Sequence, residues 1–173
     1  MKKIGDGKGE FPMGLFGFLK GKKEVSLGAP VKGECIPICE VNDPTFAEEI
    51  LGKGMAIKPA DGRITAPVDG IVSTLFPTGH ALGMTTEDGI EILIHVGLDT
   101  VQLEGQYFRP AVKAQQKVKK GELLLEADLD EIRKAGYDTV IPVIICNSEE
   151  LSSLHCNTQG EVNAGEEIIA YSK

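Results

Sequence analysis

Three histidines, at positions 80, 95 and 155, are the side chains best suited to chemistry near neutral pH. The neutral imidazole, with an ordinary pKa of about 6.5, has a lone pair that can act as a nucleophile. His95 follows the apolar run Ile90–Ile94 and precedes Gly97, which permits an abrupt bend. His80 lies in a turn that leads into another predicted strand, whereas His155 is interpreted as a surface residue. We expect His80 and His95 at the ends of neighbouring strands, able to face each other across a sheet.

Such a pair of histidines suits phosphoryl transfer. A backbone carbonyl at the Gly97 bend could accept a hydrogen bond from Nδ1 of His95 and leave Nε2 free to attack. His80 could donate to phosphate oxygens, with Thr78 orienting its ring. Phosphoryl transfer needs mainly positioning and charge stabilisation, which fits a small site that requires no cofactor.

Two other interpretations of the histidines stay open from spacing alone. A histidine on an apolar strand is often an ordinary core residue, and this applies to His95. Alternatively, the two imidazoles could bind zinc, but two ligands make an incomplete tetrahedral site. Asp99 or a carboxylate from another protein could complete it.

The elements that must position these residues are short β-strands separated by turns. Their regular spacing, with Gly, Pro and Asp-Gly between them, is typical of an antiparallel sandwich or barrel. We predict an all-β fold, an antiparallel β-sandwich with short helices. The predicted strands cover residues 31–37, 55–59, 63–66, 70–76, 81–85, 90–95, 106–108, 122–127, 142–146, 160–162 and 167–171.

Two sequence echoes indicate that the sheet contains two similar halves. Residues 29–33, Ala-Pro-Val-Lys-Gly, recur as Ala-Pro-Val-Asp-Gly at 66–70. Residues 118–122, Val-Lys-Lys-Gly-Glu, recur as Val-Asn-Ala-Gly-Glu at 162–166. Each echo places a turn glycine between β segments.

Capping residues predict two short helices between the strands. Asp43 precedes Pro44, and Gly52 marks the end of a helix that we expect over 44–51. Asp128 and the glycine at 136 bound a second helix, and a last helical turn is expected within 148–154.

Composition excludes several classes of protein. The chain has 173 residues, 42% of them apolar, which suits one domain with a real core. A net charge of −8 with only 5% aromatic residues argues against nucleic-acid binding. The longest early apolar run, 11–19, is too short for a membrane span, which needs about 20 residues. Four cysteines without a CxxC pair indicate reduced thiols and a cytoplasmic location.

The chain divides into a tail and one globular domain. Residues 1–27 are expected to be a flexible N-terminal segment, and 28–173 to form the domain. Within the tail, residues 13–23 combine leucines and phenylalanines with three lysines. This pattern is typical of an amphipathic stretch that makes peripheral contact with an anionic membrane surface.

The segments around both histidines belong to a set of motifs that resembles one known family. The chain is similar, from about Gly28 to Tyr171, to the glucose-type enzyme IIA domain of the bacterial phosphoenolpyruvate:sugar phosphotransferase system. The resemblance implies an antiparallel β-sandwich and a phosphocarrier role in sugar uptake. It rests on the motifs at 46–51, 54–59, 66–70, 76–81, 94–100, 118–122 and 139–147.

The resemblance also implies roles for individual residues. His95 looks like the residue phosphorylated on Nε2, His80 like the partner that stabilises the phosphoryl group, and Thr78 like a hydrogen-bonding residue of that pair. The implied donor is the histidine-containing phosphocarrier protein. The implied acceptor is a cysteine on an enzyme IIB domain of a sugar permease. Members of the family also bind regulatory targets, and in some complexes both histidines join a partner carboxylate around zinc.

A partner-binding face is implied around the histidines, with an apolar centre and a charged rim. Such a composition suits a transient interface. The chain departs from the family's pattern at two positions. Gly79 stands where some members carry a polar residue, and Leu93 stands where an aromatic residue can occur. These departures could alter partner preference. The expected apolar residues are Phe46, Ile50, Leu51, Phe76, Leu93, Val96 and Val101, and the rim carboxylates are Asp43 and Asp99.

Two competing functions lack the residues that they need. Residues 66–72 resemble the start of a biotinyl or lipoyl domain, but no Met-Lys-Met or Asp-Lys hairpin tip occurs. A zinc hydrolase on a related fold needs His-x-His with a further His and Asp, and this pattern is absent. A further hypothesis, a regulator that only binds other proteins, overlaps the phosphocarrier hypothesis because the same face would bind the regulatory partners.

Overall fold

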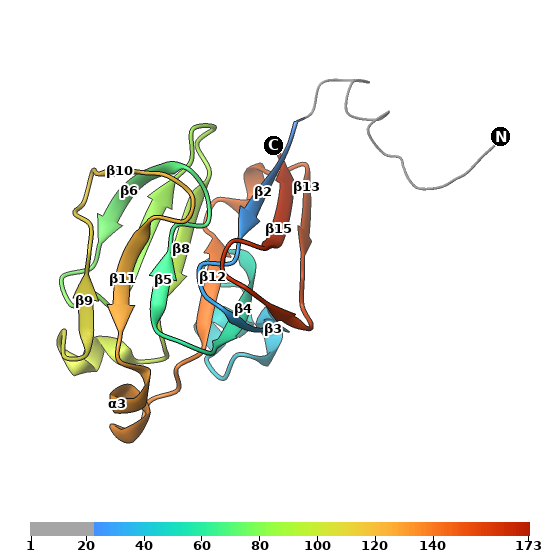
Figure 1. Cartoon of the computed structure of the whole chain (residues 1–173). Coiled ribbons are helices and arrows are strands. Elements are labelled where there is room, and N and C mark those ends of the chain that lie inside the picture. Colours follow the sequence, from blue (N-terminus) through green and yellow to red (C-terminus); the bar gives the residue numbers. More distant parts are fainter. Residues whose placement is uncertain (1–22) are drawn as a thin grey trace.

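The computed structural model describes residues 23–173, which form three antiparallel β-sheets (Figure 1). This confirms the predicted antiparallel all-β fold. The large sheet has, in spatial order, β10 (Lys117–Val118), β6 (Gly70–Leu75), β7 (Ala81–Thr85), β8 (Glu91–His95), β12 (Ile141–Ile145), β4 (Lys53–Pro59), β3 (Gly33–Pro37) and β14 (Glu161–Val162). One smaller sheet has the order β5 (Arg63–Thr65), β11 (Leu123–Ala127) and β9 (Phe108–Pro110). The other has the order β13 (Ser153–Cys156), β15 (Glu167–Ser172) and β2 (Glu24–Gly28).

The main core lies between the large sheet and the two smaller sheets. Figure 1 shows the smaller sheets side by side, with β9, β11 and β5 in front of β6 and β8. Ile92 of β8, Leu124 of β11 and Ile169 of β15 belong to one continuous buried cluster. Aliphatic side chains fill this core, as the low aromatic content requires, and their burial is the main driving force of the fold.

A second, smaller cluster covers the opposite face of the large sheet. Side chains of a strand alternate between faces, so that Ile57 and Val143 enter the main core while their neighbours Ala56 and Ile144 enter the second cluster. Strand β12 is buried at every position for this reason. The second cluster, completed by Phe46 and Leu98, supports the face on which the candidate site lies.

The two sequence echoes form equivalent structures. Val118 of β10 pairs with Gly70 of β6, and Val162 of β14 pairs with Gly33 of β3. The segments before β6 and β3 also form equivalent hydrogen bonds. The amide of Ala66 donates to the carbonyl of Glu122, and the amide of Ala29 donates to the carbonyl of Glu166. The prediction of two similar halves is thereby confirmed.

The helices are shorter than the sequence indicated. Helix α2 (Pro44–Ala47) begins at the predicted cap, since Asp43 Oδ1 accepts from the Thr45 amide at 2.9 Å. It ends four residues early because Glu49 adopts a left-handed conformation with φ of 59°. Helix α3 (Leu129–Lys134) has the predicted Asp128 cap. The turns η1 (Ile38–Glu40), η2 (Thr100–Leu103) and η3 (Ser148–Glu150) complete the fold, and β13 replaces the end of the turn predicted within 148–154.

The expected boundary between tail and domain is wrong by four residues. Strand β2 begins at Glu24 and pairs with β15 through partners such as Val25 and Tyr171, because Leu27 is an apolar side chain that the main core buries completely. The predicted membrane-touching stretch, 13–23, lies outside the described residues except for Lys23. Within residues 23–173, none of the helices has the length and apolar character that a membrane crossing demands.

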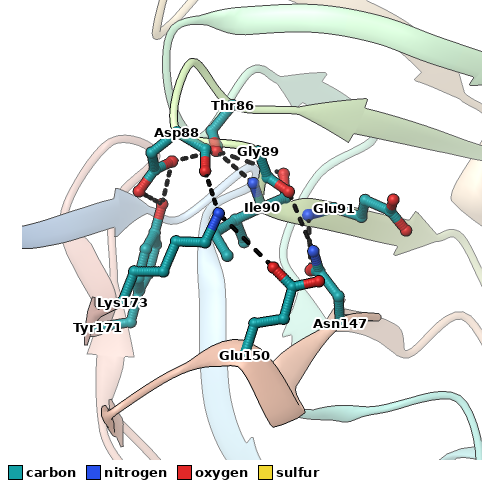
Figure 2. A network of polar contacts seen from close by, with 9 residues as sticks. All are labelled: Thr86, Asp88, Gly89, Ile90, Glu91, Asn147, Glu150, Tyr171 and Lys173. Carbon is teal, nitrogen blue, oxygen red and sulfur yellow. Dashed lines mark hydrogen bonds and ion pairs between the residues drawn. The ribbon is translucent and has the colours of Figure 1, made fainter.

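A polar network fastens the turn between β7 and β8 to the C-terminal strand (Figure 2). The Tyr171 hydroxyl donates to Asp88 Oδ1 at 3.1 Å, and Lys173 Nζ donates to the Asp88 carbonyl at 2.5 Å. The side chain of Asn147 accepts from the Glu91 amide at 2.9 Å and donates to the Gly89 carbonyl at 3.0 Å. These bonds hold the start of β8, the strand that ends at His95.

Candidate functional site

His95 lies on the face of the large sheet that the smaller sheets leave uncovered. Ile92 and Ile94 of β8 point into the main core, so the alternation of the strand places Leu93 and His95 on the opposite face. There the His95 ring packs edge-on against Phe46, with ring centroids 5.0 Å apart. His95 is half-buried, so its ring is held by packing on one side and remains accessible.

A sharp bend directly after β8 supplies a hydrogen-bond acceptor for His95. Gly97 has a φ of 82°, which favours glycine, and its carbonyl lies 2.7 Å from Nδ1 of His95. A carbonyl only accepts, so Nδ1 carries the proton and Nε2 is left with the lone pair. The structure therefore confirms the carbonyl that the sequence indicated at this bend.

His80 is placed by the strand next to β8. It immediately precedes β7, whose first residue, Ala81, is the register partner of His95. The ring is 3% exposed and packs against Phe76, with centroids 5.4 Å apart. The Thr78 hydroxyl forms a short hydrogen bond with Nδ1 of His80. The three predicted residues Thr78, His80 and His95 are thus brought together.

The two imidazoles face each other at close range and share an environment that disfavours charge. Their centroids are 4.9 Å apart with an interplanar angle of 79°. Burial, with a smaller contribution from His95, lowers the pKa of His80 from 6.5 to about 4. Burial also lowers the pKa of His95, while the Gly97 carbonyl and the carboxylates of Asp43 and Asp99 oppose that shift. Both rings are neutral near pH 7, and a neutral imidazole is the nucleophilic form.

Four large apolar side chains are exposed on segments that border the histidines. Ile50 is 66% exposed, Val101 49%, Leu51 39% and Phe76 37%. Leu93 is half-buried against the second cluster, and Asp43 and Asp99 lie close enough to His95 to act on its pKa. Exposed apolar side chains with acidic neighbours suit a protein partner rather than a small ligand.

Two residues of the expected partner face are buried. Val96 is completely buried in the main core, because the bend at Gly97 follows it and its strand alternation points inward. Its assignment to the surface is wrong. Phe46 is 3% exposed, so it supports the His95 ring from beneath and offers almost no area to a partner.

The remaining chemistry-bearing residues lie apart from this pair. His155 is exposed on β13, as predicted for a surface residue. All four cysteines are free. Over residues 23–173, no three His, Cys, Asp or Glu side chains are grouped as a metal site would need. His80 and His95 alone supply two nitrogen ligands.

The sequence analysis missed the residues that hold the bend after β8. Thr100 is fully buried and its hydroxyl donates to the Val96 carbonyl at 2.5 Å. The Gly97 and Leu98 amides donate to the carbonyls of Val140 and Asp138 at 2.9 and 3.0 Å. The signal for Thr100 is its place in the Gly-Leu-Asp-Thr run after His95. Asp138 and Val140, which precede β12, are distant from that run in sequence, so no local signal points to them.

Comparisons with known proteins agree on one family. A family model described as phosphoenolpyruvate-dependent sugar phosphotransferase system, EIIA 1, matches residues 25–151. A PTS system glucose-specific EIIA component of Oceanobacillus iheyensis is 43% identical over 147 residues, covering 85% of this chain and 89% of the relative. The solved structure of glucose permease IIA from Mycoplasma capricolum matches with a TM-score of 0.79 and 38% identity, covering 86% of this chain and 96% of that one.

Other relatives are longer proteins. A PTS system beta-glucoside-specific EIIBCA component of Bacillus subtilis is 43% identical over 153 residues, which is 88% of this chain and 25% of that protein. The chain therefore spans about a quarter of the length of such relatives and nearly the whole length of the shorter ones.

Proposed function

Because the chain belongs to the enzyme IIA family of the phosphoenolpyruvate-dependent sugar phosphotransferase system, it is a phosphotransferase component, and we propose that His95 carries the phosphoryl group. The observation that carries this proposal is the 2.7 Å contact between His95 Nδ1 and the Gly97 carbonyl. It commits the proton to Nδ1 and leaves the Nε2 lone pair available. Together with the lowered pKa of His95, it keeps the nucleophile ready at neutral pH.

The transfer itself needs no cofactor. The Nε2 lone pair of His95 attacks the phosphorus of a phosphorylated donor, and the bond between phosphorus and the donor's nitrogen breaks with its electron pair remaining on that nitrogen. The imidazole becomes cationic while Nδ1 keeps its proton. The Gly97 carbonyl and the nearby carboxylates of Asp43 and Asp99 stabilise that charge. On onward transfer the Nε2–P bond breaks and the electron pair returns to Nε2.

His80 is proposed to bind the phosphoryl group while it resides on His95. Because its pKa is about 4, His80 is neutral and can donate from one nitrogen only. If the Thr78 hydroxyl donates to Nδ1, the proton of His80 lies on Nε2 and can bond a phosphate oxygen. A centroid separation of 4.9 Å between the rings favours this role.

The partners follow from the chemistry of a relay. Relatives that carry EIIB and EIIC parts in one protein with EIIA support an enzyme IIB domain as acceptor, through a cysteine thiolate. The donor is proposed to be the histidine-containing phosphocarrier protein, whose basic surface would meet the chain's acidic rim. The apolar centre comprises Ile50, Leu51, Phe76, Leu93 and Val101. Four free thiols are in keeping with a relay that works in the cytoplasm.

Phosphorylation of single variants tests the function. Incubation with the phosphorylated donor protein should place an acid-labile phosphate on histidine in the wild type and in His155→Ala, which changes an exposed histidine on β13. His95→Ala should accept none. Histidine phosphate on a correctly folded His95→Ala variant would refute the proposal.

Regulatory partners that present a carboxylate beside the histidines could share zinc with them. His80 and His95 would then supply two ligands and the partner the third and fourth, because tetrahedral zinc needs four ligands. Affinity for such a partner should rise with added zinc in the wild type. Affinity that rises equally in His80→Gln would contradict a zinc site that uses both histidines.

A further inference from the structure

Thr100 is a buried hydroxyl side chain at the start of η2, five residues after His95, and the proposed transfer does not yet use it. We propose that Thr100 is a positioning residue that fixes the peptide bend after β8 and thereby selects the tautomer of His95. This inference rests on the proposed function only in taking His95 as the phosphoryl acceptor. Its geometric content concerns the unphosphorylated protein.

Two consecutive peptide planes form the bend, and each is held at both ends. In the plane between Val96 and Gly97, the carbonyl accepts from the Thr100 hydroxyl at 2.5 Å and the amide donates to Val140 at 2.9 Å. In the plane between Gly97 and Leu98, the amide donates to Asp138 at 3.0 Å and the carbonyl accepts from His95 Nδ1 at 2.7 Å. Three of these four bonds come from residues other than His95. Of those three, the bond from Thr100 is made by a side chain, and the bonds to Val140 and Asp138 are made by backbone carbonyls.

Gly97 makes these anchors necessary. Its φ of 82° is accessible to glycine without strain, but glycine also permits many other conformations, so the direction of its carbonyl must be set by neighbours. The fit is close as well: a Cβ at position 97 would lie 2.5 Å from Cγ2 of Thr100 and 2.8 Å from the Asp138 carbonyl. Thr100 therefore contacts the bend through its hydroxyl and restricts it through its methyl group.

The orientation of the Gly97 carbonyl decides which nitrogen of His95 is protonated. While the carbonyl faces Nδ1, the tautomer with Nδ1–H is favoured and Nε2 remains unprotonated. If the Val96 carbonyl loses its partner, rotation of the adjacent plane turns the Gly97 carbonyl away. A share of His95 then carries its proton on Nε2 and cannot attack phosphorus.

Two pairs of variants isolate the hydroxyl from the rest of the side chain. Thr100→Val replaces it by a methyl group, and Thr100→Ala differs from Thr100→Ser by the hydroxyl alone. Thr65→Val is the matched control, because Thr65 is also buried and its hydroxyl donates to a backbone carbonyl, that of Pro30, at 3.2 Å. The ¹⁵N chemical shifts of the His95 ring report the tautomer, and single-turnover phosphorylation by the phosphorylated donor protein reports the rate.

The wild type, Thr100→Ser and Thr65→Val should show the Nδ1–H tautomer at His95 and rates within about twofold of one another. Thr100→Val and Thr100→Ala should populate both tautomers and lose about tenfold in rate. The proposal is overturned if both of these variants keep the wild-type tautomer, if Thr65→Val reproduces their change, or if Thr100→Ser is as impaired as Thr100→Ala. A wild type that is not phosphorylated at His95 would refute the proposed function, while the tautomer comparison would still judge Thr100.

Discussion

The carbonyl of His80 accepts a hydrogen bond from the amide of Val96 at 2.8 Å. This bond continues the β7–β8 ladder one step beyond its last register pair, Ala81 and His95. It joins the backbone of His80 to Val96, the residue that follows His95. The backbones of the two histidines therefore cannot move apart without breaking sheet hydrogen bonds. Their spacing is a property of the sheet, so replacing one ring should leave the other in place.

Replacement of His80 by glutamine should separate acceptance of the phosphoryl group from its onward transfer. His95 keeps its Gly97 acceptor and should still be phosphorylated, whereas the His80 donor to the phosphate oxygens is displaced. We expect onward transfer to an enzyme IIB domain to slow by about a hundredfold, a size ordinary for loss of a positioned donor. Rapid-quench measurement of both half-reactions checks this. Onward transfer at the wild-type rate would remove the role assigned to His80.

Loss of the Thr78 hydroxyl should resemble a mild form of the His80 defect. Thr78→Val removes the hydrogen bond to His80 Nδ1, so the ring can adopt either tautomer, and we expect onward transfer to fall about tenfold. Thr78→Ser keeps the hydroxyl and is the control. The same onward rate in the valine and serine variants would show that the hydroxyl does not act through His80.

Stability should fall in mild acid because His80 is buried in its neutral form. Its pKa is about 4 in the folded chain and 6.5 in the unfolded chain, so between these values only the unfolded chain binds the proton. The stabilisation is complete above pH 6.5 and is lost as the pH falls through 4. Urea unfolding near pH 5 should give a free energy of unfolding lower by about 2 kcal/mol from this group than near pH 7.5.

The matched controls for that pH dependence are two glutamine variants. His80→Gln should lose most of the decrease, and the remaining histidine contribution comes from His95, whose pKa burial also lowers. His155→Gln, on exposed β13, should keep the full decrease. Equal pH profiles for His80→Gln and the wild type would contradict a buried neutral His80.

The exposed apolar side chains beside the histidines should matter for docking and little for folding. Ile50 is 66% exposed, so Ile50→Asp removes apolar contact area and adds a charge without opening a cavity. We expect the KM for the phosphorylated donor protein to rise about tenfold with little change in kcat. Ile71→Asp, at a 37% exposed position of β6 that pairs with Lys117, is the control and should leave KM unchanged. Equal effects of the two variants would argue against a localised docking face.

The network in Figure 2 predicts a purely structural effect. Asn147 is 9% exposed and its side chain satisfies the Glu91 amide and the Gly89 carbonyl, so Asn147→Ala leaves two backbone groups without these partners. The free energy of unfolding should fall by about 2 kcal/mol, measured by urea denaturation at neutral pH. Asn42→Ala, at an exposed position, should change it little. Loss of stability of the same size in both variants would contradict the role of the Asn147 bonds.

Local patterns predicted the features that depend on neighbours in sequence. The Ile90–Ile94 run, the Gly97 bend and the Asp43 cap each involve contacts within a few residues, and each is confirmed. The partner loop of the bend, at Asp138 and Val140, is distant in the chain, so no local pattern could place it against Gly97.

Sequence reasoning failed where tertiary packing decided the outcome. The family resemblance implies a surface position for Val96, but the sheet alternation sends its side chain into the main core. The helix expected over 44–51 stops at Ala47, where Glu49 turns left-handed and the next residues lead into β4. Strand β13 has only four residues, Ser153–Cys156, and such a short alternation is not recognisable as a strand until it pairs with β15.

The pairing of β2 with β15 brings the entry and the exit of the described chain to one place. Ser172 pairs with Glu24, and Lys173 bonds the Asp88 turn, which lies at the opposite end of β8 from His95. Four steps along the strand, of about 3.3 Å each, separate Glu91 from His95. A tether that continues from either end of the described chain would therefore attach at the end of β8 that is opposite to His95. The surface around His80 and His95 would stay open to one partner and then the next, and the length and stiffness of the tether would set how often a linked acceptor is met.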